Sequence, residues 1–326
     1  MLQHATFSVP ARKEGYAVDD SARALVFAIP ASRLWPDRRL QDIPRRLLSF
    51  LLLMQEDDGR MHNFMDFSRR IVDESASGDH MGRAVWAAGK VLSSNVPPGQ
   101  KASARLLFDR ALPWLVSSTW PRTKAYACLG VAERLRAEPD DSNLKLNLKK
   151  MADSLVETYR RNKVQGWNWF EEAITYDNAR LSQALFAAYT CLKDETYLKI
   201  AAESLEFLSR VTEMKDTFVP VGNQGWYMRG SDRPMYDQQP IEAGSMVEAA
   251  VLARDVTGSE SYARTARNAL GWFFGLNTKS VTVYDESNGA CYDGINPSGL
   301  NQNQGAESTL AYLLAVEALL SKEVRD

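Results

Sequence analysis

Acidic side chains with polar or aromatic neighbours recur along this chain, and they are the residues best suited to chemistry. One carboxylic acid that donates a proton and a second carboxylate that activates water or attacks directly are together sufficient to hydrolyse a glycosidic bond. The acids in suitable surroundings are Asp20, Asp66, Glu74, Asp79, Glu171, Glu172, Asp177, Asp237, Glu242 and Glu307.

Glu171 has the neighbours that a general acid needs. It follows Trp169 and Phe170 directly, and apolar rings that exclude water from a carboxyl group raise its pKa. We therefore expect Glu171 to be the acid, with Asp177 or Glu242 helping to activate water. Arg180 lies three residues after Asp177, on the same helix face, where it either holds the carboxylate ionised or serves the structure alone.

The same acids also have a structural interpretation. An Asp at a helix N-cap, or a Glu in the first turn, satisfies exposed N–H groups and complements the helix dipole. For Asp20, Asp79 and Asp177 this interpretation is as strong as the catalytic one.

Rings and amides accompany the acids. A sugar stacks its C–H face on aromatic rings and needs polar partners for its hydroxyls, so this mixture of residues suits a carbohydrate. The residues that we expect to bind substrate are Asp20, His62, Asp79, Trp167, Trp169, Arg180, Trp226, Tyr227, Gln239, Gln304 and Glu307.

Metal and phosphate chemistry have weak support in the sequence. His4, His62 and His80 are not spaced as a helical metal pair, and no cysteine stands near them. No glycine-rich phosphate loop is present, and a calcium site built from loop carboxylates stays open. We expect no metal and no cofactor. The cysteines are expected to be buried free thiols: Cys128, Cys191 and Cys291.

Helices must position these residues. Six runs rich in Ala, Gly and Ser begin just after polar clusters that open at Asp19, Asp79, Arg122, Asp177, Gln238 and Asn303. More amphipathic segments, with Lys, Arg and Glu among Leu, Phe and Trp, lie between them, near residues 38–56, 101–118, 141–162, 195–213 and 259–276. One small-residue inner helix and one charged outer helix per unit predict a stack of helical hairpins.

Six hairpins favour a closed ring, so we predict an all-α fold, an (α/α)6 toroid, with an open helical array as the alternative. Eleven helices are expected, with one outer helix missing. A length of 326 residues with 45% hydrophobic content supports a single domain over residues 1–326.

Long connections precede most of the small-residue helices. They run through residues 57–78, 163–176, 214–237 and 277–302, and in a hairpin ring they all emerge at the N-terminal ends of the inner helices. Loops of this length usually bind or catalyse something. The segments Asp177-Asn178-Ala179-Arg180 and Asp20-Ser21-Ala22-Arg23 look like diverged copies of one unit.

The charge balance indicates which classes of partner are unsuitable. A net charge of −2 and a pI near 6.0 argue against nucleic acid or an anionic membrane as a partner. Neither a signal peptide nor an apolar stretch of membrane-spanning length is seen, so we expect a cytoplasmic protein.

Six segments of the chain are similar to those of a known family: LQHATFSVPARKEGYAVDDSARAL, HNFMDFSRR, WFEEAITYDNARL, GNQGWYMRG, YDQQPIEAGSMVEA and NQNQGAESTLAYLLA. At these segments the chain resembles a bacterial family of six-hairpin, glycosidase-like proteins, found fused to or beside glycosyltransferases and beside mannoside phosphorylases. The resemblance runs from Leu2 to about Leu320, and it departs from the family pattern at Ala17 and Ser21. It implies metabolism of mannose- or glucose-containing glycans, with a glycosyltransferase as a candidate partner.

The residues and the resemblance together favour a glycoside hydrolase. The first alternative is a non-catalytic glycan-binding or accessory domain of a glycosyltransferase system. The second is a sugar epimerase, which needs a base such as His62 or His80.

Overall fold

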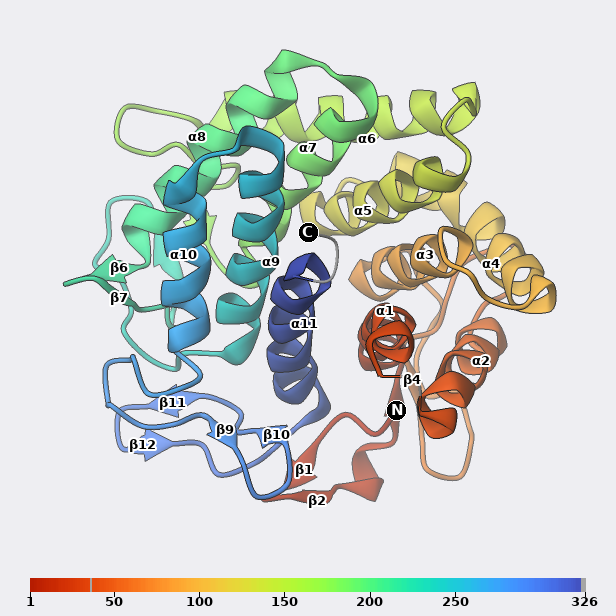
Figure 1. Cartoon of the computed structure of the whole chain (residues 1–326), viewed down its shortest axis with the longest axis horizontal. Coiled ribbons are helices and arrows are strands. Elements are labelled where there is room, and N and C mark those ends of the chain that lie inside the picture. The colour runs from red at the N-terminus through yellow and green to blue at the C-terminus, as the bar shows by residue number, and fades with distance from the viewer. Residues whose placement is uncertain (36, 324–326) are drawn as a thin grey trace. The chain divides into compact units, whose positions relative to one another are not determined.

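The computed structural model describes residues 1–35 and 37–323. Its described residues form eleven α-helices that alternate between two kinds (Figure 1). The small-residue helices are α1 (Val18–Leu34), α3 (Asp79–Leu92), α5 (Pro121–Ala137), α7 (Ala179–Leu192), α9 (Pro240–Thr257) and α11 (Ala306–Glu323). The amphipathic ones are α2 (Arg38–Leu53), α4 (Pro98–Ser117), α6 (Ser142–Asn162), α8 (Glu195–Val211) and α10 (Glu260–Gly271).

All eleven predicted helices are confirmed, with small differences at their ends. The last amphipathic segment was expected to reach residue 276, but α10 ends at Gly271. Gly275 has a φ of +92°, and this left-handed conformation turns the chain away from the helix path.

Short antiparallel strand pairs lie in the connections: β1–β2, β3–β4, β5–β8, β6–β7, β9–β10 and β11–β12. A 3-10 turn, η1, spans Arg12–Glu14. The strands are β1 (Ala5–Thr6), β2 (Val9–Pro10), β3 (Tyr16–Ala17), β4 (Phe64–Met65), β5 (Ala173–Ile174), β6 (Glu213–Met214), β7 (Thr217–Phe218), β8 (Tyr227–Met228), β9 (Tyr284–Asp285), β10 (Ala290–Cys291), β11 (Ile295–Asn296) and β12 (Gly299–Leu300).

Contacts within the chain divide it into two compact units. The first consists of Met1–Gln3, Ala11–Leu155 and Ala187–Asp194, and the second of His4–Pro10, Val156–Phe186 and Glu195–Asp326. The single domain that we expected from length and composition therefore stays a prediction.

In the first unit, α1, α3 and α5 lie side by side, and α2 and α4 pack outside them (Figure 1). Glycine permits the closest of these approaches. A Cβ atom on Gly89 of α3 would lie 2.2 Å from the carbonyl oxygen of Gly130, and one on Gly130 of α5 would lie 2.6 Å from that of Val85. Small residues in these helices thus let two backbones meet.

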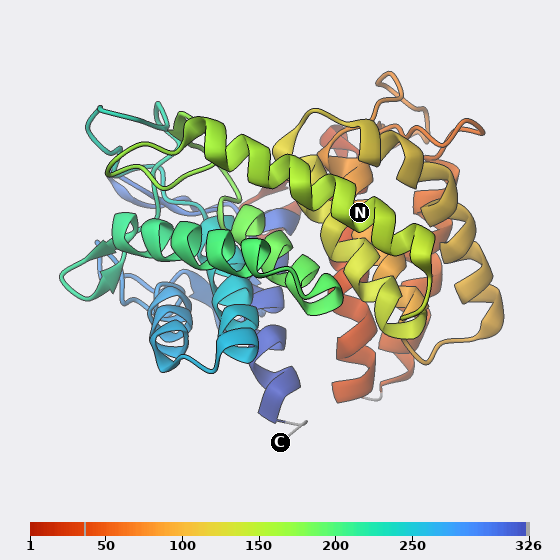
Figure 2. The same cartoon turned by 90° about the horizontal axis from the view of Figure 1, so that it is seen from above.

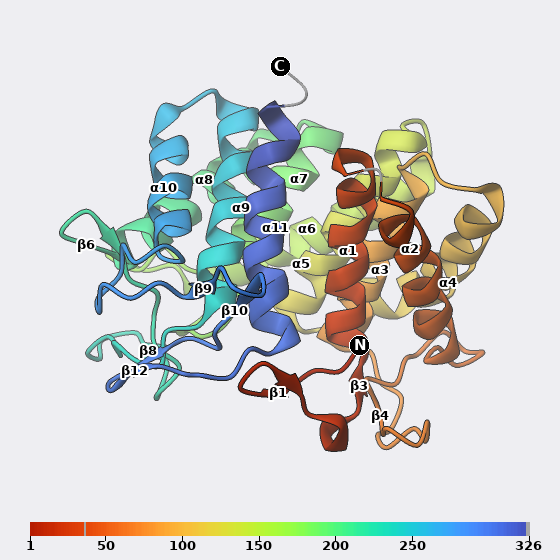
Figure 3. The ribbon, with the colours of Figure 1, turned by 60° about the horizontal axis from the view of Figure 1, so that its bottom comes forward.

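In the second unit, α9 packs between α10 and α11, and the three run alongside one another (Figure 3). Gly244 of α9 also lets two helices approach closely. A Cβ atom there would lie 2.6 Å from the Ala311 carbonyl oxygen of α11. The loops that carry β8 to β12 gather at the N-terminal ends of α9 and α11 (Figure 3). The expected elaborated end is therefore present within this unit.

The cysteines are free, as predicted. Cys128 and Cys291 are buried and Cys191 is half-buried. Burial raises the pKa of the Cys128 thiol to about 12, so this group stays neutral and packs as a small apolar side chain. None of the described helices combines the length and the apolar character needed to cross a membrane.

Candidate functional site

Two of the three predicted catalytic acids meet in the second unit. Asp177 comes just before α7, and Glu242 lies in the first turn of α9. The Glu242 carboxylate accepts hydrogen bonds from the Asp177 backbone N–H and from the Asn178 side-chain amide, the latter at 2.7 Å. Glu242 thus joins the N-terminal ends of two helices, and its carboxyl group lies beside that of Asp177.

Burial gives Glu242 an unusual proton affinity. Its side chain is 8% exposed, and loss of water raises the pKa of its carboxyl group to about 7. The Asn178 hydrogen bond opposes this rise, and the negative charge of Asp177 adds to it. Because the pKa lies near neutrality, Glu242 can hold or release a proton under ordinary conditions.

Arg180 supplies the positive charge of this cluster. Its Nε atom lies 3.2 Å from Oδ1 of Asp177, which confirms the predicted pairing. Its other nitrogens pair with Glu248 and donate to Gln183 at 2.7 Å. Sequence reasoning missed Glu248, Gln183 and Asn178. Only Asn178 was marked by its neighbours, because it follows Asp177 directly.

The backbone at Asp177 is also unusual. Its φ of +44° lies in the left-handed region, which non-glycine residues seldom adopt. Asp is among the side chains that tolerate this conformation, and such residues concentrate at functional sites. The conformation accompanies the close approach of the Asp177 N–H to Glu242.

The aromatic loop before α7 is more buried than its composition suggested. Trp169 is fully buried and contacts the rings of Phe170 and Phe207, while Trp167 packs edge-on against Phe207 and Tyr227. We expected Trp167 and Trp169 to stack on a sugar. In this structure their rings instead form part of the core, because the side chain of Phe207 in α8 covers them.

Glu171 lies in this loop but has a different setting from Glu242. It is half-buried, with Oε2 out of contact with solvent, and its backbone carbonyl accepts a 2.8 Å hydrogen bond from Trp167 Nε1. Its assignment as the general acid stays a prediction. Pairing of β5 with β8 brings Trp226 and Tyr227 to the same loop, and both are half-buried.

The remaining predicted residues of the second unit lie at helix starts and in loops. Gln239 is the half-buried N-cap residue of α9, and Glu307 is half-buried in the first turn of α11. Gln304 donates to Asp285 at 2.7 Å and accepts from Asn288 at 2.8 Å, so its amide is held by the loop between β9 and β10.

A second polar cluster lies in the first unit, around Asp19 and Arg83. The Asp19 carboxylate pairs with Arg83 and accepts from the Asn63 amide at 3.0 Å. Desolvation acts against ionisation of Asp19, but the positive charges of Arg83 and Arg23 outweigh it and lower its pKa. The predicted residue Asp20 is fully buried and pairs with Arg23 at 2.9 Å.

The proposed duplication has a structural counterpart in these ion pairs. Asp20 with Arg23 and Asp177 with Arg180 are both buried pairs of residues three apart at the start of a small-residue helix. Of these two pairs, only that of Asp177 and Arg180 lies beside a carboxyl group with a raised pKa, that of Glu242.

The histidines of the first unit have different partners. Both ring nitrogens of His62 are engaged, Nε2 with Glu56 at 2.7 Å and Nδ1 with the Asp73 carbonyl at 2.8 Å. Burial opposes the charge, but these hydrogen bonds raise the pKa of His62. Its role in substrate binding stays a prediction. His80 Nε2 lies 3.0 Å from the Met61 carbonyl, and Asp79 accepts from Thr123 at 2.6 Å.

Among the described residues, no three His, Cys, Asp or Glu side chains are grouped to hold a metal ion. Within each cluster, the side chains instead bind one another through ion pairs and hydrogen bonds. Proton transfer by carboxyl groups is the chemistry that these arrangements offer.

No family model matches the chain, and no curated protein matches it. Solved structures do. Cellobiose 2-epimerase from Bacillus thermoamylovorans matches with a TM-score of 0.76 at 11% identity, over 99% of this chain and 92% of that one. A D-mannose isomerase matches with a TM-score of 0.73 at 12% identity, over 98% and 92%. An α-1,6-mannanase of glycoside hydrolase family 76 from Salegentibacter matches with a TM-score of 0.65 at 12% identity, over 98% of this chain and 92% of that one.

The chain has the (α/α)6 toroid fold. This confirms the fold class predicted from the alternating helices, including the count of eleven in the described residues. Toroids of this kind include enzymes named for action on carbohydrates, both epimerases and glycoside hydrolases. At identities of 9 to 15% the likeness extends to the fold alone.

Proposed function

We propose that this toroid is a carbohydrate-active enzyme that hydrolyses a mannose- or glucose-containing glycan, with Glu242 and Asp177 as its catalytic carboxyl groups. The observation that carries the proposal is the buried pair itself, in which one group has a pKa of about 7 and the other has an arginine counter-charge. Titratable groups whose surroundings differ in this way are typical of an acid and a base working together.

In the proposed reaction, the protonated Glu242 gives its proton to the glycosidic oxygen as the bond from C1 to that oxygen breaks. A water molecule forms the new bond to C1, and its proton passes to Asp177. Arg180 keeps the Asp177 charge in place, and Asn178 orients the Glu242 carboxyl group through the 2.7 Å hydrogen bond. This changes our first assignment of roles, in which Glu171 was the acid.

Paired substitutions test which acid donates the proton. Glu242→Gln keeps the size and the hydrogen-bond acceptor but has no proton to transfer, so we expect turnover of oligosaccharides to fall by about a hundredfold to ten-thousandfold. Glu171→Gln should retain most activity. The reverse result would restore Glu171 as the acid. Full activity in both variants would refute carboxyl catalysis by either group.

A sugar epimerase or isomerase is the second candidate, and His80 is the observation that favours it. Hydrogen bonding of Nε2 to the Met61 carbonyl fixes the proton there and leaves Nδ1 as the basic nitrogen of the neutral ring. His80 also lies near enough to Asp19 for the two side chains to interact electrostatically. The cellobiose 2-epimerase and D-mannose isomerase that share the fold support this reading.

The candidates differ in their products. A base that removes the C2 proton of a reducing sugar leads to deuterium incorporation at C2 in D2O without shortening the glycan, and His80→Gln would abolish it. Binding of a glycan with neither reaction would point to an accessory domain for a glycosyltransferase.

We also propose that the protein acts on its glycan in the cytoplasm.

A further inference from the structure

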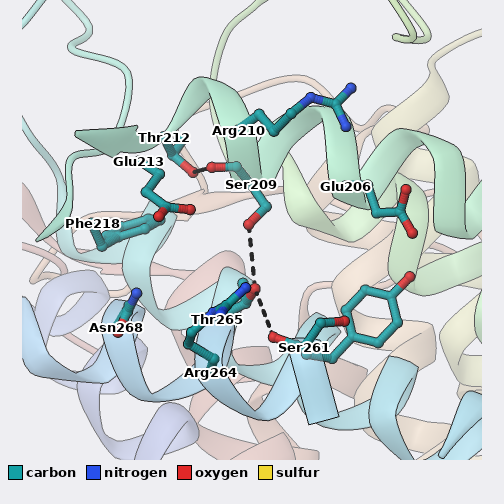
Figure 4. A pocket seen from close by; sticks show the side chains of 11 residues that line it. Glu206, Ser209, Arg210, Thr212, Glu213, Phe218, Ser261, Arg264, Thr265 and Asn268 are labelled. Carbon is teal, nitrogen blue, oxygen red and sulfur yellow. Dashed lines mark hydrogen bonds between the residues drawn. The ribbon is translucent and has the colours of Figure 1, made fainter. Parts of the chain in front are cut away.

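A pocket lies in the second unit, between α8 and α10, and shares no residue with the Asp177 and Glu242 cluster (Figure 4). Its volume is about 330 Å³, which falls within the roughly 300–1,000 Å³ typical of ligand pockets. The β6–β7 hairpin follows α8 and supplies Glu213 and Phe218 to the lining (Figure 2).

Several hydrogen bonds fix the shape of this pocket. The hydroxyls of Ser209 in α8 and Thr265 in α10 lie 3.3 Å apart and connect the two helices, as Figure 4 shows. The Thr265 hydroxyl also donates to the Ser261 carbonyl at 3.3 Å. Burial and the negative charge of Glu206 raise the pKa of Tyr262 to about 12, so the hydroxyl keeps its proton. Both helices are therefore joined at the pocket before any ligand binds.

Other polar side chains of the lining have no such partner. In the part of the chain that the structure describes, Arg210, Glu213, Arg264 and Asn268 make neither an ion pair nor a side-chain hydrogen bond with another residue. Figure 4 shows Glu213 and Asn268 on opposite sides of the pocket. These donors and acceptors are available to a ligand.

Their charges indicate the class of that ligand. Two arginines and two glutamates line the pocket, so it carries no net charge to select an anion or a cation. Guanidinium and amide groups donate while carboxylates accept, and a sugar hydroxyl can do both at once. Phe218 adds an apolar ring against which C–H groups pack.

We propose that this pocket binds an uncharged sugar unit of a glycan, as a holding site separate from the reaction centre. The proposal rests on the proposed function only for the substrate class. Such a site keeps a long glycan on the enzyme between turnovers, because a second contact raises the local concentration of the chain. A substrate too short to span both sites gains nothing from the second one.

Binding at the pocket is measured by NMR titration of isotope-labelled protein with α-1,6-linked mannotetraose and with cellotetraose. We expect one of them to shift the backbone amide resonance of residue 268, which the variants also have. The double variant Arg264→Ala and Asn268→Ala should weaken that binding about tenfold or more, as loss of hydrogen bonds to a charged group does. Arg267→Ala, on the same helix but outside the lining, is the matched control and should bind normally.

Two results would overturn the proposed sugar site. No shift at Asn268, or equal binding by the double variant and the control, would overturn the pocket as a sugar site. Inorganic phosphate serves as the anion probe, and its binding there in preference to both sugars would overturn the ligand class. Arg264→Gln, a milder change at an exposed position, repeats the test if the double variant does not fold.

This test is independent of catalysis because it reads resonances at the pocket. An inactive wild-type protein that still binds sugar at Asn268 would refute the hydrolase and keep the holding site. In an active enzyme, the double variant should turn over a short aryl glycoside normally and lose activity on long glycans.

Discussion

Glu242 carries the most specific expectation at the residue scale. Its pKa of about 7 means that the proton is present below this pH and lost above it. We predict that kcat/KM falls as pH rises through about 7, because the donor form disappears. A pH–rate profile of the wild type measures this, and a profile flat between pH 6 and 8 would contradict the assignment.

The same group makes stability depend on pH. The pKa of Glu242 is raised from 4.5 in the unfolded chain to about 7 in the folded one, so the folded state binds the proton more tightly. Its contribution is full below about pH 4.5 and is lost as pH rises through about 7, a change of about 3 kcal/mol in the free energy of unfolding.

Urea unfolding between pH 5 and 8 checks this sign. We expect wild-type stability to fall across this interval more steeply than that of Glu242→Gln, which cannot ionise. An identical pH dependence in the two proteins would show that Glu242 does not titrate as described.

At the scale of elements, glycine permits the contact between α3 and α5. Gly130→Ala places a Cβ atom 2.6 Å from the Val85 carbonyl oxygen, so the helices must separate, and we expect a loss of about 1–3 kcal/mol in the free energy of unfolding. Gly99 of α4 is the control, because a Cβ atom there meets nothing within 4 Å. Gly99→Ala should be neutral or slightly stabilising, and equal effects of the two changes in denaturant unfolding would contradict the packing account.

The helices could be predicted because their signals are local. Small residues mark helices that touch other backbones, and charged amphipathic segments mark those that cover them. The ion pair of Asp177 with Arg180 was predictable for the same reason, since three residues on a helix bring side chains together.

Contacts between segments that are far apart in the sequence could not be predicted, because they leave no local sequence pattern. Asp177 and Glu242 are sixty-five residues apart and meet only because α7 and α9 start near each other. The rings of Trp167 and Trp169 suggested a sugar platform, yet Phe207 of α8 decides that they are buried. Composition predicts which side chains a loop has, whereas tertiary packing decides which face solvent.

At the scale of the whole molecule, the toroid fold accommodates more than one carbohydrate chemistry, and the residues of this chain must decide among them. The two buried Asp–Arg pairs, which the proposed duplication relates, have different surroundings. Asp177 has Glu242 as a neighbour, and Asp20 lies next to the Asp19 and Arg83 cluster with His80 nearby. A hydrolase is expected from the first arrangement and an epimerase from the second.

Reaction of the wild type with manno- and gluco-oligosaccharides in ¹⁸O-labelled water separates these outcomes most directly, with products read by mass spectrometry. Hydrolysis breaks the bond between C1 and the glycosidic oxygen, so we predict shortened glycans with ¹⁸O at the new reducing end, and none from Glu242→Gln. Glycans of unchanged length, with or without isomerised reducing ends, would contradict the central claim that the Asp177 and Glu242 pair hydrolyses a glycan.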